Sequence, residues 1–372
     1  MPPLPPPAPR PLGRVLALPR YDRLGASSRL RFFDPQPHLA AAGLDVSTAP
    51  FFDDGYLRRL YAGQPVRGWT LADRYRRRMA ALKAAGRTDL LWIEKEALPW
   101  LPAGVERRLF GGRPYVLDFD DAWHLRYAGH RLAPLRRLLG DKLERLVAGA
   151  TLTVVANDAL ASWAEAAGAR RLLRLPTPVD LARYQAALAP NRPPGDRPPG
   201  EFRVGWIGTP SSARYLAALA EPLAALAASG PLTLVTIARH PVALPGVPEE
   251  FIPWSEAGET AALAGIDAGI MPLPHTPFAQ GKSGFKLLQY MAAGKAVVAS
   301  PVGENRRIVA DGVTGLWADS PEGWVQALEA LRGDLDLRHR LAAAGRDLVA
   351  REYDLAVLGP RLAAALAQVA RG

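Results

Sequence analysis

Short runs of apolar and β-branched residues alternate along most of the chain with longer stretches whose apolar residues recur at helical spacing. Such alternation is typical of βα units that surround a mainly parallel sheet. In the first half, the pattern predicts strands at 14–19, 44–49, 89–93, 115–118, 152–156 and 172–175. The helices expected between several of these strands are 28–42, 56–62, 71–85 and 132–148.

The alternation stops at residues 185–201, QAALAPNRPPGDRPPGE, which contain two Pro-Pro pairs and little apolar content. This composition predicts an interdomain linker. The alternation then restarts, with strands expected at 202–207, 232–237, 265–271 and 296–300, and helices at 211–228, 257–264, 284–293 and 304–310. We therefore predict an α/β protein of two doubly wound, Rossmann-like domains, 14–184 and 202–352, facing each other across a cleft.

The proline-rich start, residues 1–13 (MPPLPPPAPRPLG), lacks the apolar core of a signal peptide and is expected to be a disordered tail. No run of about 18 uninterrupted apolar residues occurs, so we expect no membrane span. The chain has no cysteine, which excludes disulfides and thiolate chemistry and suits a cytoplasmic setting. The six histidines are scattered, without the spacing of a dedicated zinc site.

The formal net charge of +10 has two interpretations. One is a nucleic-acid or anionic-membrane partner, and the other is an arginine-rich composition spread over surface helices. The basic runs, such as those at 74–78 and 136–137, are short, and no RNA-binding aromatic motif lies among them. We therefore expect no nucleic-acid partner, whereas an acidic substrate or an acceptor at a membrane surface is compatible with the charge.

The stretch GKSGFKLLQYMAAGKAVVASPVG, residues 281–303, holds three of the six lysines of the chain. Ser283 is a suitable N-cap and Gly294 a suitable residue after the last turn, so a helix of about ten residues is expected. Lys282 and Lys286 would then lie beside a helix N-terminus, which is unfavourable for cations unless an anion binds there. A diphosphate would resolve the conflict; an ordinary surface helix with solvated lysines is the alternative.

Two further turns follow predicted strands of the same domain. In VGWIGTPSSARYL, residues 204–216, small and hydroxyl residues would let the backbone approach a phosphate, or Ser211 or Ser212 would simply cap a helix. In ASPVGENRRIVADGVTG, residues 299–315, Gly303 lies between a strand and a helix. Ligands of open α/β sheets bind at this carboxyl edge, so three such turns in one domain favour a ligand site.

Candidate residues of the first domain also follow strand ends. In LDFDDAWH, the aspartates could orient acceptor hydroxyls and His124 could accept a proton; helix capping by Asp120 or Asp121 is the alternative. In GASSRLR, residues 25–31, Ser27, Ser28, Arg29 and Arg31 either face the cleft or form an N-cap with solvated arginines. The charged segment WIEKEALPW, with Glu94, Lys95 and Glu96, is expected to be a solvated patch.

FKLLQYMAAGKAVVASPVG resembles the donor-binding signature of the family 4 glycosyltransferases, the group 1 class with the GT-B fold. GASSR, YVLDFDDAWH, RLPTPVD and GWIGTPSS fall where such proteins carry similar segments, so the resemblance covers most of the chain from about residue 14. It implies an acceptor-binding N-terminal domain, a nucleotide-sugar-binding C-terminal domain, retention of anomeric configuration and no obligatory metal. It also implies that the last segment, 353–372, is a helix that crosses back to the first domain.

The resemblance implies that Lys282 and Lys286 bind the donor diphosphate and that Gln289 binds the ribose. The donor-binding set expected from it is Gly208, Thr209, Ser211, Ser212, Lys282, Gly284, Phe285, Lys286, Gln289, Gly303 and Asn305. The expected acceptor-binding residues are Ser27, Ser28, Arg29 and Asp120, and the expected catalytic residues are His124, Asp121 and Lys286. The main chemical task is to stabilise the charge that grows on the leaving nucleoside diphosphate.

The family often has two glutamates eight residues apart, and here those positions are Gly281 and Gln289. A further family glutamate would fall on Arg307, with Glu304 as the nearby acid. We therefore predict a retaining, hexosyltransferase-type enzyme that needs no cofactor beyond its nucleotide-sugar and acts on a glycan, lipid-linked or small-molecule acceptor. We expect it in the cytoplasm, and peripheral contact with the inner face of the membrane is compatible with the sequence. The alternatives are a degenerate GT-B scaffold and a nucleotide-sugar 2-epimerase.

Overall fold

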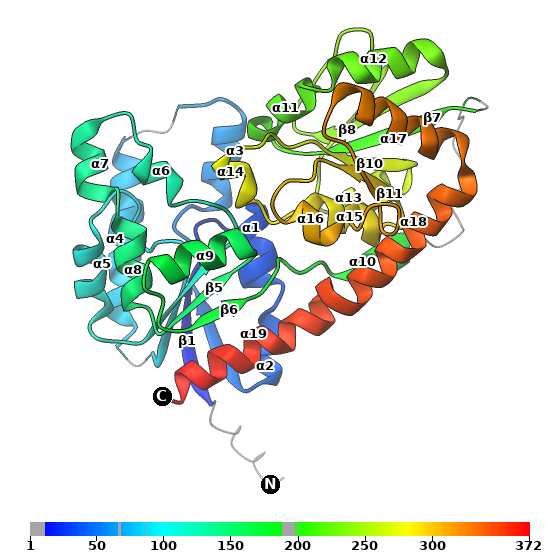
Figure 1. Ribbon diagram of the computed structural model, residues 1–372. Coiled ribbons are helices and arrows are strands. Elements are labelled where there is room, and N and C mark those ends of the chain that lie inside the picture. The colour runs from blue at the N-terminus through cyan, green and yellow to red at the C-terminus, as the bar shows by residue number, and fades with distance from the viewer. Residues whose placement is uncertain (1–11, 66–67, 87, 188–197, 199) are drawn as a thin grey trace, which may run out of the picture.

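The computed structural model describes residues 12–65, 68–86, 88–187, 198 and 200–372 (Figure 1). Most of the predicted tail and linker therefore lies outside the described residues. Two sheets of six parallel strands each form the centres of two α/β domains. Two doubly wound domains were predicted, and the structure confirms them.

The N-terminal sheet has the strand order β2-β1-β3-β4-β5-β6. Its strands are β1 Gly13–Leu18, β2 Leu44–Thr48, β3 Leu90–Glu94, β4 Tyr115–Phe119, β5 Leu152–Val155 and β6 Leu172–Arg174. The central strands β3, β4 and β5 are buried throughout, as expected when helices cover both faces of a parallel sheet. The strand order reverses between β1 and β3, which places a ligand crevice at their carboxyl ends.

The helices of this domain are α1 Ala26–Ser28, the π-helix η1 Arg29–Phe33, α2 Gln36–Ala41, α3 Asp54–Tyr61, α4 Gly68–Ala84, α5 Ala103–Phe110, α6 Leu125–Ala128, α7 Ala133–Leu139, α8 Lys142–Gly149, α9 Asp158–Ala166 and α10 Leu181–Ala187. The single helix expected over 28–42 is instead three elements, and the break between η1 and α2 falls at Pro35, which has no N–H to continue the preceding turn. The helix expected over 132–148 is likewise divided, at Gly140.

The C-terminal sheet has the order β12-β11-β10-β7-β8-β9. Its strands are β7 Phe202–Ile207, β8 Leu232–Ala238, β9 Glu249–Pro253, β10 Ala268–Met271, β11 Ala296–Ala299 and β12 Leu316–Trp317. Here the order reverses between β7 and β10, so the loops that follow these two strands border the crevice. The sequence pattern did not predict the edge strands β9 and β12.

The helices of this domain are α11 Pro210–Ala217, α12 Ala220–Ser229, α13 Glu259–Ala264, α14 Pro277–Gln280, α15 Phe285–Ala292, α16 Asn305–Ile308, α17 Pro321–Gly333, α18 Leu335–Leu348, the π-helix η2 Val349–Tyr353 and α19 Leu355–Ala370. The last of them, red in Figure 1, runs from the C-terminal domain to the N-terminal one. It buries Leu358, Leu362 and Leu366 in the core that also contains Val15 and Leu44.

The chain passes between the domains at two adjacent points. Val179 N–H donates to the Tyr353 carbonyl at 2.9 Å, and Leu355 N–H donates to the Val179 carbonyl at 2.9 Å. These two bonds form a short parallel bridge between the segments that enter and leave the C-terminal domain. The relative position of the two sheets is thus fixed at one edge of the cleft.

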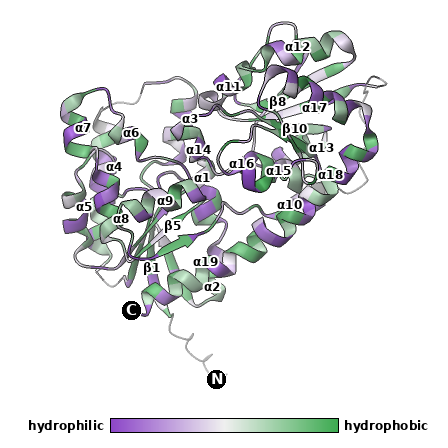
Figure 2. Cartoon of the chain, in the orientation of Figure 1, coloured by the Kyte–Doolittle hydropathy of each residue, from purple (hydrophilic) through white to green (hydrophobic). Residues whose placement is uncertain are grey.

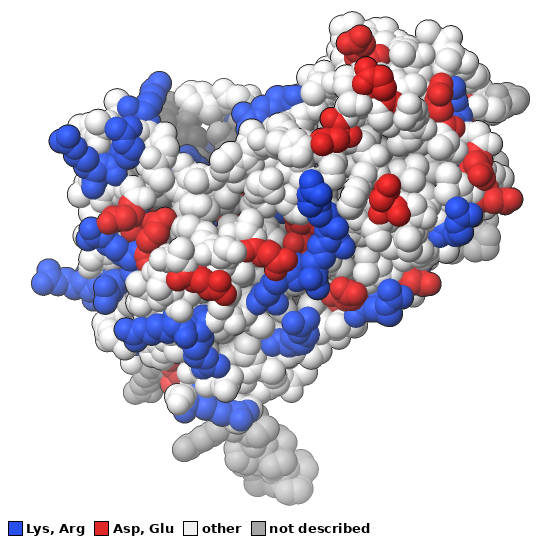
Figure 3. Space-filling view, viewed as in Figure 1, with Lys and Arg blue, Asp and Glu red and all other residues white. Residues whose placement is uncertain are grey.

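The strands are mainly apolar, whereas the helices around them carry both hydrophobic and hydrophilic residues, as the hydropathy colours of Figure 2 show. On the face drawn in Figure 3, lysines and arginines lie in separate groups with acidic side chains between them. This face therefore has no continuous basic track of the kind that nucleic-acid binding needs. Within the described parts of the chain, no helix is both long and apolar enough to cross a bilayer.

Candidate active site

A cavity of about 300 Å³ lies between the carboxyl ends of the two sheets. Both domains contribute to it, through loops and turns that follow their strands, including those after β1, β7 and β10 beside the strand-order reversals. Its lining includes Ser27, Arg29, Tyr61, Asp120, Asp121 and Thr177 from the N-terminal domain, and Gly208, Thr209, Ser211, Ser212, Arg239, Trp254, Glu259, Lys282, Gly284, Phe285, Lys286 and Gln289 from the C-terminal domain. Lys282 and Lys286 therefore open into one cavity in the cleft.

Lys286 is a cation without a carboxylate partner among the described residues. Its ammonium lies 3.3 Å from Ser212 Oγ and 4.4 Å from the centre of the Trp206 ring. Burial, helped by the nearby charge of Lys282, lowers the pKa of Lys286 to about 7. An anion in the cavity would reverse both effects, because it would supply the missing opposite charge.

The helix that carries Lys286 begins without a side-chain cap. Its N-cap is Gly284, at φ +67°, and not Ser283 as the sequence suggested. Glycine accepts this left-handed conformation without strain. The first N–H groups of α15 are thus available, and Lys282, whose ammonium lies 5.0 Å from the Phe278 ring centre, stands beside them.

The turn from β7 into α11 lines the cavity opposite Lys286, which its Ser212 contacts. Thr209 is its N-cap, and Ser212 Oγ accepts a hydrogen bond from Thr209 N–H at 3.1 Å. A Cβ on Gly208 would come within 2.3 Å of the Trp206 ring, so this position needs glycine. Helix capping and cavity lining therefore occur together in this turn.

Glu259, the first residue of α13, is a site residue that the sequence did not indicate. It accepts hydrogen bonds from Gln289 Nε2 at 2.8 Å, Tyr184 Oη at 3.0 Å and Trp254 Nε1 at 2.8 Å. The two carboxylate oxygens of Glu259 thus accept three hydrogen bonds in total. Glu259 consequently fixes the amide of Gln289 in the cavity wall.

Gly281 lies where the two domains touch. A Cβ at this position would come within 2.5 Å of Ala122 Cβ, across the cleft. Asn157 Nδ2 fastens the same contact by donating to the carbonyls of Gly281, at 2.9 Å, and Lys282, at 3.2 Å. A glutamate side chain at 281 would not fit between the domains in this arrangement.

Asp121, the neighbour of Ala122, supplies a carboxylate to the cavity from the opposite domain. No described residue forms a hydrogen bond or ion pair with its side chain. Burial, together with the Asp120 carboxylate, raises the pKa of Asp121 to about 6, although Lys282 opposes the shift. Asp121 is therefore mostly ionised at neutral pH and free to accept hydrogen bonds.

Asp120 has a different environment. Lys95 Nζ lies 2.7 Å from its Oδ1 and 3.3 Å from Glu94 Oε1. Burial opposes ionisation of Asp120, but the Lys95 charge and a hydrogen bond from Ser27 prevail and lower its pKa to about 2. Asp120 therefore anchors its loop, which positions Asp121 at the cavity.

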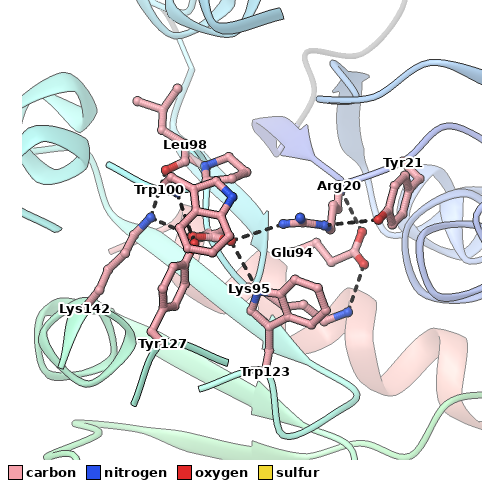
Figure 4. Close-up of polar contacts among 12 residues, drawn as sticks. Arg20, Tyr21, Glu94, Lys95, Leu98, Trp100, Trp123, Tyr127 and Lys142 are labelled. Atoms are coloured by element: carbon pink, nitrogen blue, oxygen red, sulfur yellow. Dashed lines mark hydrogen bonds and ion pairs between the residues drawn. The ribbon is translucent and has the colours of Figure 1, made fainter. Parts of the chain in front are cut away.

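The segment WIEKE is buried, so the expected solvated patch is wrong: Glu94, Lys95 and Glu96 are 2%, 4% and 3% exposed. Figure 4 shows the ionic network around them. Glu96 accepts from Arg20 at 3.1 Å, Lys142 at 2.6 Å and the Tyr127 hydroxyl at 2.7 Å. Partners from other segments thus neutralise the charges below the carboxyl ends of β3 and β4.

Four predicted site residues do not line the cavity. His124 stacks on Trp163, with ring centres 4.2 Å apart, and burial lowers its pKa to about 4. Ser28 is fully buried and donates to Glu94 Oε2 at 2.5 Å. Gly303 N–H donates to Gln280 Oε1 at 2.9 Å, and Asn305 Nδ2 donates to the Ser300 carbonyl at 3.0 Å. Each of the four is held in place by these local contacts.

The other predicted residues meet at the cavity. They are Ser27, Arg29, Asp120, Asp121, Gly208, Thr209, Ser211, Ser212, Lys282, Gly284, Phe285, Lys286 and Gln289. Among the described residues, no group of three or more His, Asp or Glu side chains is placed to hold a metal ion.

A family model described as "Glycosyl transferases group 1" matches residues 244–334. A comparison with curated proteins finds no match. Among solved structures, sucrose-phosphate synthase from Thermosynechococcus elongatus is similar at 16% identity and TM-score 0.66, over 96% of this chain and 99% of the other.

Two further structures are similar over nearly their whole length. HepE of Anabaena, in complex with UDP and glucose, matches at 16% identity and TM-score 0.66, over 96% of this chain and 100% of the other. WaaG, a glycosyltransferase involved in lipopolysaccharide biosynthesis, matches at 17% identity and TM-score 0.67, over 94% and 98%. This chain therefore has the GT-B fold, and its segment 244–334 is similar to group 1 glycosyl transferases.

Proposed function

We propose that the protein is a retaining glycosyltransferase of family 4, of the hexosyltransferase type, which transfers a sugar from a nucleoside diphosphate donor. One observation carries this proposal: Lys286 is a cation without a carboxylate partner, beside Lys282, in the cavity between the two domains. A buried cation that lacks a partner is costly to the fold. A diphosphate at this position would provide the partner.

The lysines would act on the leaving group. As the bond between sugar and phosphate breaks, negative charge grows on the terminal phosphate of the nucleoside diphosphate. Lys286, protonated once the diphosphate is bound, and Lys282 would stabilise that charge, together with the first N–H groups of α15. Because side chains supply this charge, the reaction is proposed to need no metal.

The ribose is proposed to bind at Gln289. Glu259 holds the amide of Gln289 by accepting from its Nε2 at 2.8 Å, so the amide is fixed before the donor arrives. A fixed group loses little conformational entropy on binding. A uridine donor is the first candidate, because a similar structure, HepE, was solved with UDP and glucose.

Asp121 is proposed to be the catalytic carboxylate. It enters the cavity from the N-terminal domain, beside Ala122, at the contact that excludes a side chain from position 281. It would accept a hydrogen bond or a proton from a hydroxyl of the reacting sugars. Asp120, Ser27 and Lys95 would hold its loop, and Ser27 and Arg29 would face the acceptor.

The cavity favours this function over the two alternatives. A scaffold does not need two lysines that open into one cleft. A 2-epimerase needs several acid–base groups around the sugar, and of the three carboxylates in the cavity lining, Asp120 and Glu259 already have partners. The acceptor is proposed to be a carbohydrate or a lipid-linked sugar, reached from the cytoplasm with peripheral contact at the membrane.

The test is thermal stability against UDP, GDP, ADP and their sugar conjugates. A ligand at 100 times its dissociation constant stabilises by about 2.7 kcal/mol. We expect one nucleotide to raise the melting temperature of the wild type, and Lys286→Ala to lose that rise. If no nucleotide shifts the melting temperature of folded wild-type protein, the transferase proposal fails.

A further inference from the structure

The cavity has a second cationic wall, away from the lysines. We propose that Arg29 and Arg239, placed around Trp254, form an anion-binding site. It would hold a carboxylate or phosphate group carried by the acceptor or by the transferred sugar. This inference rests on the proposed function, since it names the class of substrate that the same cleft would select.

The sheet order separates the two walls. Arg239 follows β8 and Trp254 follows β9, whereas the loop that carries the lysines follows β10. In the order β10-β7-β8-β9, two strand spacings, about 10 Å, separate β10 from β8, and three, about 14 Å, separate it from β9. Arg239 and Trp254 therefore lie on loops distinct from the loop after β10 and from the turn after β7 that Lys286 contacts.

Arg29 has hydrogen-bond donors that nothing in the described chain satisfies. Its side chain is 2% exposed, yet its buried Nε and Nη1 have no hydrogen-bond partner. The Glu256 carboxylate is 3.7 Å from Nε, too far for a hydrogen bond. A buried guanidinium that lines a cavity with unused donors is stabilised when an acceptor enters.

Arg239 is held by aromatic rings alone. Its guanidinium carbon is 3.8 Å from the centre of the Tyr61 ring and 5.9 Å from that of Trp254. No described residue forms a hydrogen bond or an ion pair with it. Arg29 approaches the same Trp254 ring, at 5.5 Å, so two guanidinium groups lie around one indole.

The local acids do not neutralise this wall. Glu256 is within 4 Å of three arginines: Arg23 at 3.4 Å, Arg29 at 3.7 Å and Arg183 at 3.8 Å. Asp34 pairs with Arg23, at 3.1 Å. Glu259 is a third carboxylate at this wall, since it accepts from Trp254 Nε1 at 2.8 Å. With Arg239 included, four positive charges thus face three negative ones, which leaves an excess of one positive charge.

Guanidinium groups suit carboxylates and phosphates, because their planar forks can donate two parallel hydrogen bonds. The ring faces of Tyr61 and Trp254 hold the guanidinium groups in place and limit their contact with water. A neutral substrate would leave the excess positive charge uncompensated and would form weaker hydrogen bonds to the guanidinium groups, so the site should discriminate against it.

Calorimetric titration tests the site with four probes, on the wild type, Arg29→Gln, Arg239→Gln and Arg183→Gln. Glucose 6-phosphate is compared with glucose, with and without saturating UDP, to represent an anionic acceptor. UDP-glucuronate is compared with UDP-glucose to represent an anionic donor. Arg183→Gln is the matched control, because Arg183 contacts Glu256 but does not line the cavity.

We expect the charged probe of one pair to bind wild type at least tenfold more tightly than its neutral partner. Arg239→Gln and Arg29→Gln should abolish that preference, and Arg183→Gln should keep it. The pair that shows the preference identifies the source of the anion. Arg239→Gln keeps the test decisive if Arg29→Gln does not fold.

Two results would overturn the inference: no charge preference in either pair, or a tenfold loss of UDP affinity in both arginine variants without any preference. The second result would assign the arginines to the nucleotide. Failure of the proposed function is a separate observation, namely that wild type binds no nucleotide. The glucose 6-phosphate titration without UDP still tests the arginines in that case.

Discussion

Replacement of Lys286 by methionine should stabilise the unliganded protein while it removes nucleotide binding. The pKa of Lys286 falls from its usual value of 10.5 to about 7, chiefly through burial. At 1.36 kcal/mol per pH unit, this fall corresponds to about 5 kcal/mol of lost stability as an upper limit. Lys286 is partly exposed to the cavity, so solvent screening reduces the cost to on the order of 1–2 kcal/mol.

The pH window of this effect follows from proton binding. The folded protein binds fewer protons at Lys286 than the unfolded chain between about pH 7 and pH 10.5. Wild-type stability therefore gains a contribution as pH rises through this window and loses it as pH falls towards 7. Lys286→Met has no such group, so its advantage over wild type should be largest near pH 7 and shrink by pH 10.

Urea denaturation of both proteins at pH 7 and pH 10 measures the difference. Lys83→Met is the matched control, because Lys83 lies on the exposed side of α4 and should change stability by less than about 0.5 kcal/mol. We expect Lys286→Met to be more stable than wild type by about 1 kcal/mol at pH 7. If Lys286→Met is less stable than wild type at pH 7, or if their difference does not change with pH, the described environment of Lys286 is wrong.

Three other substitutions have distinct expected outcomes. Asp121→Asn should lower turnover at least 100-fold and leave UDP affinity within twofold. The wild-type rate should decrease as the pH is lowered through about 6, where Asp121 becomes protonated; a variant with the wild-type pH profile would show that Asp121 is not catalytic. Gly281→Glu should push Ala122 away, open the cleft and increase the radius of gyration in solution scattering; a compact, active variant would speak against the contact. His124→Gln should change kcat less than threefold, since His124 stacks on Trp163 outside the cavity; a 100-fold loss would restore it as a catalytic residue.

The fold was predictable wherever a strand is a short buried apolar run. AVVA of β11 is apolar at every position and LTVV of β5 is buried at every position, and the pattern located both. EEFIP of β9 is an edge strand of partly exposed residues, so periodicity gave no signal. Glu259 was also missed, because its role depends on Gln289 and Tyr184, which are 30 and 75 residues away in sequence.

The charges of the first domain were harder to interpret. Glu96 pairs with Arg20, which is 76 residues away in sequence, and with Lys142, which is 46 residues away. Local composition therefore suggested solvation where long-range partners allow burial. The same limit applies to Gly281, since the Ala122 contact that excludes a side chain there comes from the other domain.

Calorimetry of UDP binding at pH 8, in Tris and in HEPES, tests the lysine site most directly. Lys286, with its pKa of about 7, is mostly neutral at this pH and must take up a proton to pair with a diphosphate. We predict that wild type takes up about 0.9 proton for each UDP bound, and that Lys286→Met shows weaker binding and no uptake. Equal UDP affinity in both proteins, with no difference in proton uptake, would contradict the assignment of Lys286 to the donor diphosphate.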